Sequence, residues 1–335
     1  MRKLALTLAS AITMAAAAAL PAQAQEQDYL LATASTGGTY YPVGVALATL
    51  VKVKLQPSEG IGMSAINSAG SAENVALLRD GEVQFAILQG LYGAYATSGT
   101  GPLESEGKQE NLRSITMLWP NVEHFVINSE FAESGTIDDM ENVKGKTISM
   151  GAQNSGTLGS NEMILGNLGY NMNEDFDLAY MGYSPSADAL QNGQIAAMST
   201  PAGPPVSAVS AAFANMGDGI TLLSFTEEQR KKANGEFEDL WTAFKVPAGL
   251  YPGVDEDVTT IAQPNFLAVD ESVPEETVYL ITKTIFENLP FLQGIHAATK
   301  EMSLETATGG LPAKLHPGAL RYYEEAGVNV PDRLK

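Results

Sequence analysis

The chain has 335 residues, of which 44% are hydrophobic and 17% charged, a composition typical of a globular protein large enough for two domains. Its 39 acidic and 19 basic residues give a formal net charge of −20, which nucleic-acid phosphates would repel, so neither DNA nor RNA is an expected partner. The absence of cysteine excludes disulfides, thiolate metal sites and cysteine nucleophiles.

Residues 1–24 have the pattern of a secretory signal peptide. Arg2 and Lys3 supply a positive start, residues 4–20 form an apolar run, and Ala22-Gln23-Ala24 is a small-residue cleavage signal. A membrane anchor is the alternative, but no basic residue follows the run to stop transfer. We therefore expect cleavage after Ala24 and a mature protein in the periplasm.

The next part of the chain predicts a βαβαβ unit. Strands are expected at residues 29–34, 62–67 and 83–88, because these short apolar runs are bounded by Gly, Ser and Asn. Helices are expected between them at 39–54 and 72–80, the second with Ser71 as its N-cap.

The same order of elements returns later in the chain. Strands are expected at 146–150, 178–182 and 195–200, with helices at 157–168 and 184–192, the second capped by Ser184 with Pro185 at N1. Leu78–Ala86 also aligns with Leu190–Met198, and Gly38-Thr39 with Gly156-Thr157. The sequence thus predicts an α/β fold made of two similar halves.

Two further segments predict the connection between these halves. Residues 119–127 and 261–269 are both strand-like with a central Pro-Asn, and proline within a strand favours an edge or a bend. We interpret them as hinge strands that join two lobes. Lobe I then comprises residues 25–120 and 264–335, and lobe II residues 121–263. The C-terminal part of lobe I is helical, with Pro274 and Pro317 expected at helix N1 positions.

The loops that follow the predicted strands are the expected ligand site, because ligands of open α/β sheets bind beyond the carboxyl ends of the strands. These loops are rich in Gly, Ser, Thr and Asn and contain neither Lys nor Arg. Backbone N–H groups and hydroxyls at helix N-termini suit a carboxylate or another small anion, although each Ser or Thr alone is more often a helix cap. The expected ligand-binding residues are Gly38, Thr39, Tyr40, Ser68, Ser71, Gln89, Asn154, Ser155, Gly156, Thr157, Thr200, Ala202 and Gly203.

Five segments, taken in order, resemble the TAXI family of TRAP-transporter solute-binding proteins: Thr36–Gly44, Asn67–Asn74, Lys144–Thr157, Val246–Val258 and Leu315–Tyr323. This resemblance implies a type II periplasmic-binding fold, with two α/β lobes joined by two hinge strands and a ligand cleft between them. It also implies capture of a small organic anion, a carboxylate or an amino acid such as glutamate, for a TRAP membrane permease with fused or paired subunits.

Some positions depart from that family's pattern. Gln84 stands where an acidic residue is common, and Gln89-Gly90-Leu91 stands where Gln-Ser-Asp is frequent. Without that Asp, no partner for a ligand ammonium is evident in this loop. The departure favours a carboxylate that lacks an amine.

An ABC-importer receptor or a thiamine-precursor-binding protein is the alternative, and a periplasmic enzyme on the same fold is less favoured. The sequence contains no H-E-x-x-H, G-x-S-x-G or Walker motif, and no catalytic residue, metal site or cofactor is predicted. The three histidines, His124, His296 and His316, are too dispersed to indicate a metal site. His124, on the first hinge strand, either packs in the strand or faces the cleft.

Overall fold

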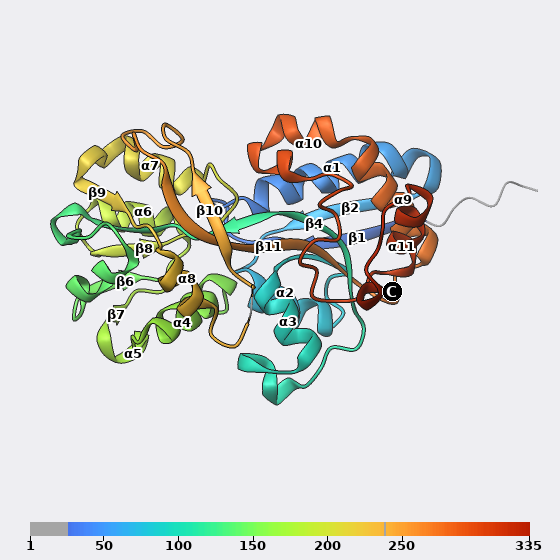
Figure 1. Ribbon diagram of the computed structural model, residues 1–335. Coiled ribbons are helices and arrows are strands. Elements are labelled where there is room, and N and C mark those ends of the chain that lie inside the picture. Colours follow the sequence, from blue (N-terminus) through green and yellow to red (C-terminus); the bar gives the residue numbers. More distant parts are fainter. Residues whose placement is uncertain (1–25, 238) are drawn as a thin grey trace, which may run out of the picture.

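Two α/β halves, each with its own sheet, make up the protein in a computed structural model that describes residues 26–237 and 239–335 (Figure 1). The predicted signal peptide lies outside the described residues. Within this part of the chain, no helix is long and apolar enough to cross a membrane.

The first sheet has six strands: β1 (Gln27–Ala32), β2 (Ile61–Ile66), β3 (Phe85–Gln89), β4 (Leu112–Val122), β10 (Thr242–Val246) and β11 (Val258–Asp270). In space they follow the order β10-β11-β3-β1-β2, and β4 also pairs with β11. Its half contains the helices α1 (Tyr40–Glu59), α2 (Ser71–Arg79), α3 (Gly90–Ser98), α9 (Glu275–Glu287), α10 (Leu289–Ile295) and α11 (Pro317–Glu325).

The second sheet has five strands: β5 (Phe125–Asn128), β6 (Thr147–Ser149), β7 (Asp177–Leu178), β8 (Ala197–Ser199) and β9 (Ile220–Leu222). Their order in space is β7-β6-β8-β5-β9. The accompanying helices are α4 (Gly156–Leu168), α5 (Met172–Asp175), α6 (Tyr183–Gln191), α7 (Ser207–Met216) and α8 (Glu227–Asn234).

The two sheets share one topology, which confirms the predicted α/β class built from two similar halves. β1 lies between β2 and β3 and is parallel to both, and β6 lies in the same way between β7 and β8. An antiparallel strand then follows in each sheet, β11 beside β3 and β5 beside β8. In both halves, therefore, the carboxyl ends of the three parallel strands meet at one edge of the sheet.

Strands β4 and β11 are long and antiparallel, and β11 extends from one half of the molecule to the other (Figure 1). Pro120 lies opposite Pro264, and the register shifts between Pro264 and Phe266. The irregularity thus falls where the prolines predicted a bend, since proline cannot donate a hydrogen bond within a ladder.

The buried apolar side chains form separate clusters in the two halves, although Val122, Val246, Ile261 and Ala262, on strands of the first sheet, pack in the clusters of the second half. One cluster draws its members only from residues 29–119 and 266–334. Two others draw theirs from residues 122–262, apart from Leu91. Each half therefore has a core of its own, which allows it to move as a unit.

Several predicted boundaries were wrong by a few residues. Gly70 and Gly182, not Ser71 and Ser184, are the N-caps of α2 and α6, and Pro274 is the N-cap of α9 and not its first residue. Gly70 has φ +128°, which an L side chain rarely adopts, so this cap requires glycine. The strands of the second half are shorter than predicted, with only two residues in β7.

Candidate ligand-binding site

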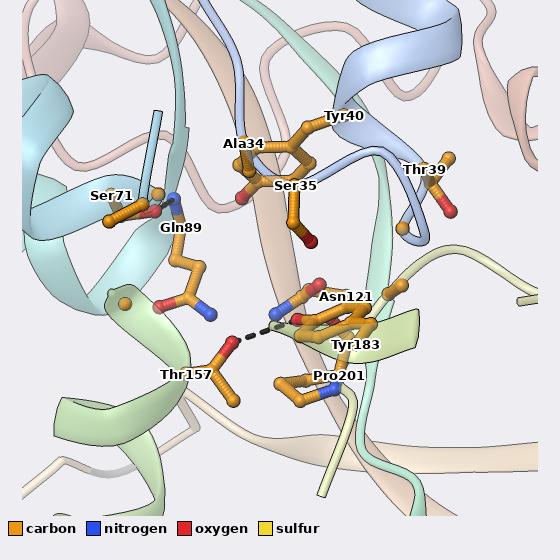
Figure 2. Close-up of a pocket in the computed structure, with 15 residues that line it drawn as sticks. Ala34, Ser35, Thr39, Tyr40, Ser71, Gln89, Asn121, Thr157, Tyr183 and Pro201 are labelled. Atoms are coloured by element: carbon orange, nitrogen blue, oxygen red, sulfur yellow. Dashed lines mark hydrogen bonds between the residues drawn. The ribbon is translucent and has the colours of Figure 1, made fainter. Parts of the chain in front are cut away.

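A small cavity lies between the two halves, where several helices begin (Figure 2). The cavity volume is about 30 Å³, which is room for about two water molecules. Its walls are formed by Ala34, Ser35, Gly38, Thr39, Tyr40, Ala69, Gly70, Ser71, Gln89, Asn121, Gly156, Thr157, Tyr183, Pro201 and Ala202.

Four of these wall residues are the first residues of helices. Tyr40 begins α1, Ser71 begins α2, Gly156 begins α4 and Tyr183 begins α6. These helices follow β1, β2, β6 and β7, so two come from each half. The first N–H groups of a helix lack partners within it, and each N-terminus carries a partial positive charge of about half a unit. Four such ends around one cavity favour a small anion.

The cavity wall contains no Asp, Glu, Lys, Arg or His. Its side-chain chemistry consists of hydroxyls and carboxamides, from residues such as Ser35, Gln89, Asn121 and Thr157. An anion bound here would therefore be held by backbone N–H groups and neutral donors, without an ion pair.

The structure brings together eight of the residues that the sequence indicated. They are Gly38, Thr39, Tyr40, Ser71, Gln89, Gly156, Thr157 and Ala202. They come from loops that lie up to 164 positions apart in the chain and meet because the two halves face each other.

The other five expected residues do not line this cavity. Asn154 and Ser155 line a separate hollow between α2, α3 and α4, and the Ser155 hydroxyl accepts the Leu158 N–H at 3.0 Å as a helix cap. Ser68 is turned to Asn74, with 2.6 Å between its hydroxyl and Oδ1.

Thr200 and Gly203 are used in the surrounding structure instead. The Thr200 N–H donates to the His124 carbonyl at 3.1 Å within the second sheet. The Gly203 carbonyl accepts the Thr39 hydroxyl at 2.7 Å. Neither residue is part of the cavity wall.

Ala69, Gly70 and Pro201 lie in the expected ligand loops 67–71 and 200–204 but were not among the predicted ligand-binding residues. Four wall residues were not predicted at all: Ala34, Ser35, Asn121 and Tyr183. Asn121 lies on β4 beside the bend at Pro120, and the repeated Pro-Asn pair was a usable signal for it. Tyr183 was missed because α6 begins two residues earlier than its Ser184-Pro185 pair predicted.

Hydroxyls around the cavity are already engaged in hydrogen bonds. Tyr40 donates to Asn265 Oδ1. The Tyr183 hydroxyl donates its proton to the Pro201 carbonyl at 2.6 Å. The Thr157 hydroxyl, 2.8 Å from the Tyr183 oxygen, is therefore the donor in the bond between these two side chains (Figure 2). Burial raises the pKa of both tyrosines well above their ordinary value, which keeps these phenols neutral.

Contacts between the halves surround the cavity. The Glu73 N–H at the start of α2 donates to the Asn154 carbonyl at 3.0 Å, and the Ser207 hydroxyl at the start of α7 donates to the Gly37 carbonyl at 2.9 Å. Together with the bond from Thr39 to Gly203, these contacts hold the halves together on both sides of the site.

His124 is fully buried and does not line the cavity, which decides between the two alternatives left by the sequence. Its Nδ1 lies 2.8 Å from the Val122 carbonyl and its Nε2 2.8 Å from the Tyr251 hydroxyl. Burial lowers the pKa of His124 to about 4, so the ring is neutral at neutral pH. In the part of the chain that the structure describes, His, Asp and Glu form no group of three that could hold a metal ion.

Replacing Tyr40 with phenylalanine should lower stability more than it lowers affinity. The lost hydroxyl leaves buried Asn265 Oδ1 without its donor, at a cost of about 1–3 kcal/mol in the free energy of unfolding. Because the phenol proton is directed at Asn265, an anion loses little, and affinity should stay within about threefold of wild type. Chemical denaturation and calorimetric titration measure the two effects. A tenfold loss of affinity at unchanged stability would show that the hydroxyl contacts the ligand.

Residues 31–327 match the family described as the NMT1-like family. Among solved structures, PhnD1 from Prochlorococcus marinus in complex with methylphosphonate is similar at 12% identity and a TM-score of 0.53, over 82% of this chain and 91% of that one. MatC from Rhodopseudomonas palustris with bound malate is similar at 13% identity and a TM-score of 0.51, over 90% and 96% of the two chains.

The periplasmic binding protein BugD is similar at 12% identity and a TM-score of 0.51, over 91% of this chain and 98% of that one. At such identities these similarities establish the fold alone. The architecture is that of periplasmic binding proteins, as the sequence resemblance implied.

Proposed function

Because the chain belongs to the NMT1-like family, we propose that it is a periplasmic solute-binding protein that captures a small organic anion and delivers it to a membrane transporter. The observation that carries this proposal is the convergence of four helix N-termini, two from each half, on one cavity without charged side chains. Bound malate in MatC and methylphosphonate in PhnD1 are small anions in proteins of the same fold, which supports the proposal.

We propose that ligand binding closes two lobes about the strands β4 and β11. Lobe I comprises residues 25–120 and 264–335, and lobe II comprises residues 121–263. The separate cores of the halves and the irregular register at Pro120 and Pro264 support this division. A few strand residues that absorb changes in φ and ψ are the usual hinge of such a closure. The hydrogen bonds between the halves are then made on closing.

For the transporter, a TRAP permease is the first candidate, on the strength of the five sequence segments that resemble TAXI proteins. The matched family carries no TRAP designation, so a receptor for an ABC importer, or one of thiamine-precursor type, is the second candidate. A neighbouring gene for a TRAP membrane subunit supports the first, and a neighbouring ATPase gene supports the second. In both cases we propose binding without turnover.

A melting-temperature screen against small organic acids tests the proposed function. A ligand that binds only the folded protein stabilises it by about 2.7 kcal/mol at 100 times its Kd, so a true ligand should raise the melting temperature in a concentration-dependent way. The same incubations, followed by chromatography, should recover the acid unchanged. Conversion of the acid to a product would indicate an enzyme, and no shift with any acid would contradict the proposal.

A further inference from the structure

Four carboxamide side chains gather where β3, β4 and β11 meet. Gln89 is the last residue of β3 and pairs with Asn265 of β11, while Asn121 of β4 pairs with Gln263 of β11. Directly paired residues project from the same face of a sheet, and so do residues two apart on one strand. All four therefore share one face, and all are at least 97% buried.

Two of these carboxamides, Gln263 and Asn265, are held through their oxygens, while Gln263 Nε2 and Asn265 Nδ2 have no hydrogen-bond partner among the described residues. Gln263 Oε1 accepts the Leu91 N–H at 2.9 Å near the start of α3, and Asn265 Oδ1 accepts the Tyr40 hydroxyl. Gln263 and Asn265 do not line the cavity.

The other two carboxamides, Gln89 and Asn121, line the cavity with unpaired atoms. Gln89 Oε1 and both Oδ1 and Nδ2 of Asn121 have no hydrogen-bond partner among the described residues. Both side chains point into the space beside Thr157 and Ser35 (Figure 2). Buried polar groups are nearly always paired, so atoms directed into a cavity are positioned to meet a ligand.

These unpaired atoms specify a chemistry that a simple carboxylate does not have. Asn121 Oδ1 requires a donor, whereas a carboxylate offers only acceptors. Gln89 Oε1 is turned toward Gly156, so the Gln89 amide nitrogen faces the cavity, and this nitrogen and Asn121 Nδ2 require acceptors. A ligand hydroxyl or carboxamide supplies both kinds of group without charge.

An ammonium group would also donate, but it lacks a partner charge here. No carboxylate lines the cavity, and a buried charge without an opposite charge is strongly disfavoured. The nearby carboxyl of Glu123 does not remedy this, because burial raises its pKa to about 8 and keeps it protonated at neutral pH.

We propose that Asn121 and Gln89 select, among small carboxylates, those whose carbon chain bears an uncharged hydroxyl or carboxamide, over unsubstituted and amine-bearing ones. The carboxylate lies at the helix N-termini and the second group lies against the two carboxamides. This inference rests on the proposed function, and it names the ligand class for the same cavity.

Titration calorimetry with two matched series tests the selection on the wild-type protein. Lactate, propionate and alanine differ only in a hydroxyl, a hydrogen or an ammonium on one skeleton, and so do malate, succinate and aspartate. In the series that fits the cavity, the hydroxy acid should bind at least about tenfold tighter than both analogues, because each analogue leaves a buried group unpaired or a charge uncompensated.

Equal affinities within a series, or tightest binding of the amino acid, would overturn the inference and leave the proposed function standing. A ligand from the melting screen that bears neither hydroxyl nor carboxamide would do the same. If no acid binds at all, both proposals fail.

Two variants separate selection from structural support. Asn121→Leu keeps the side-chain size and should remove the preference for the hydroxy acid, whereas Asn121→Asp supplies a carboxylate and should favour the amino acid of the same series. Asn173→Leu, at an exposed position in α5, is the control and should leave the preference unchanged. If Asn121→Leu fails to fold, Asn121→Asp alone tests the inference. In that variant the preference should shift from the hydroxy acid to the amino acid, and an unchanged preference would overturn the inference.

Discussion

Replacing Gly156 with leucine should reduce the affinity for any ligand of the cavity by about 100-fold or more, equivalent to about 2.7 kcal/mol. A Cβ at this position would lie 2.5 Å from Gln89 Oε1 and 2.7 Å from Ser71 Cβ. Gly156 belongs to the half with the second sheet, whereas Gln89 and Ser71 belong to the other. The clash therefore arises only when the halves close, and the unliganded protein, free to open, should melt near the wild-type temperature.

Gly166 provides a matched control on the same helix. A Cβ there meets no atom within 4 Å, so Gly166→Leu should bind ligand as the wild type does. Calorimetric titration of both variants with the acid found in the melting screen measures the effect. Wild-type affinity in Gly156→Leu would show that the ligand binds elsewhere.

Between pH 6.5 and 8, the wild-type protein should lose about 2 kcal/mol of unfolding free energy relative to a Glu123→Gln variant. The Glu123 carboxyl is fully buried, with Trp241 Nε1 donating to Oε1 at 3.3 Å and Oε2 without a partner among the described residues. Burial raises its pKa from 4.5 to about 8. Within that window the folded protein keeps a proton that the unfolded chain has released, so stability falls as pH rises.

The window above pH 6.5 isolates this carboxyl from the histidines. Burial lowers the pKa of His124 from 6.5 to about 4, so its contribution rises with pH only below 6.5. His296 and His316 shift in the same direction. Where the folded and unfolded states differ by one bound proton, the unfolding free energy changes by about 1.4 kcal/mol per pH unit. Urea denaturation of both proteins at pH 6.5, 7.2 and 8 measures the difference, and parallel stability curves would show that Glu123 is already ionised.

The order of strands and helices could be predicted because short apolar runs alternate with Gly- and Ser-rich turns twice along the chain. The position of the cavity could be predicted as well, since it depends on which loops follow parallel strands. Helix starts were less predictable: Ser71 looks like a cap, but its hydroxyl accepts the Gln89 N–H at 3.1 Å and Gly70 takes the cap position.

Asn121 shows why the remaining part of the site could not be predicted. Its place in the cavity wall depends on the pairing of β4 with β11 and on the irregular register beside Pro120, neither of which local sequence specifies. Ser155 shows the reverse case: it resembles a ligand residue in a Gly-rich loop, but its hydroxyl serves the Leu158 N–H. Long-range register and local capping decide which polar residues remain free for a ligand.

Small-angle X-ray scattering of the protein with and without the acid that most raises its melting temperature tests the central claim most directly. We propose that two halves with separate cores close over the ligand and form the contacts from Thr39 to Gly203 and from Glu73 to Asn154. Saturating ligand should therefore reduce the radius of gyration, and Gly156→Leu should show no reduction. An unchanged radius of gyration in the wild type, at a ligand concentration that saturates binding by calorimetry, would contradict closure around this cavity.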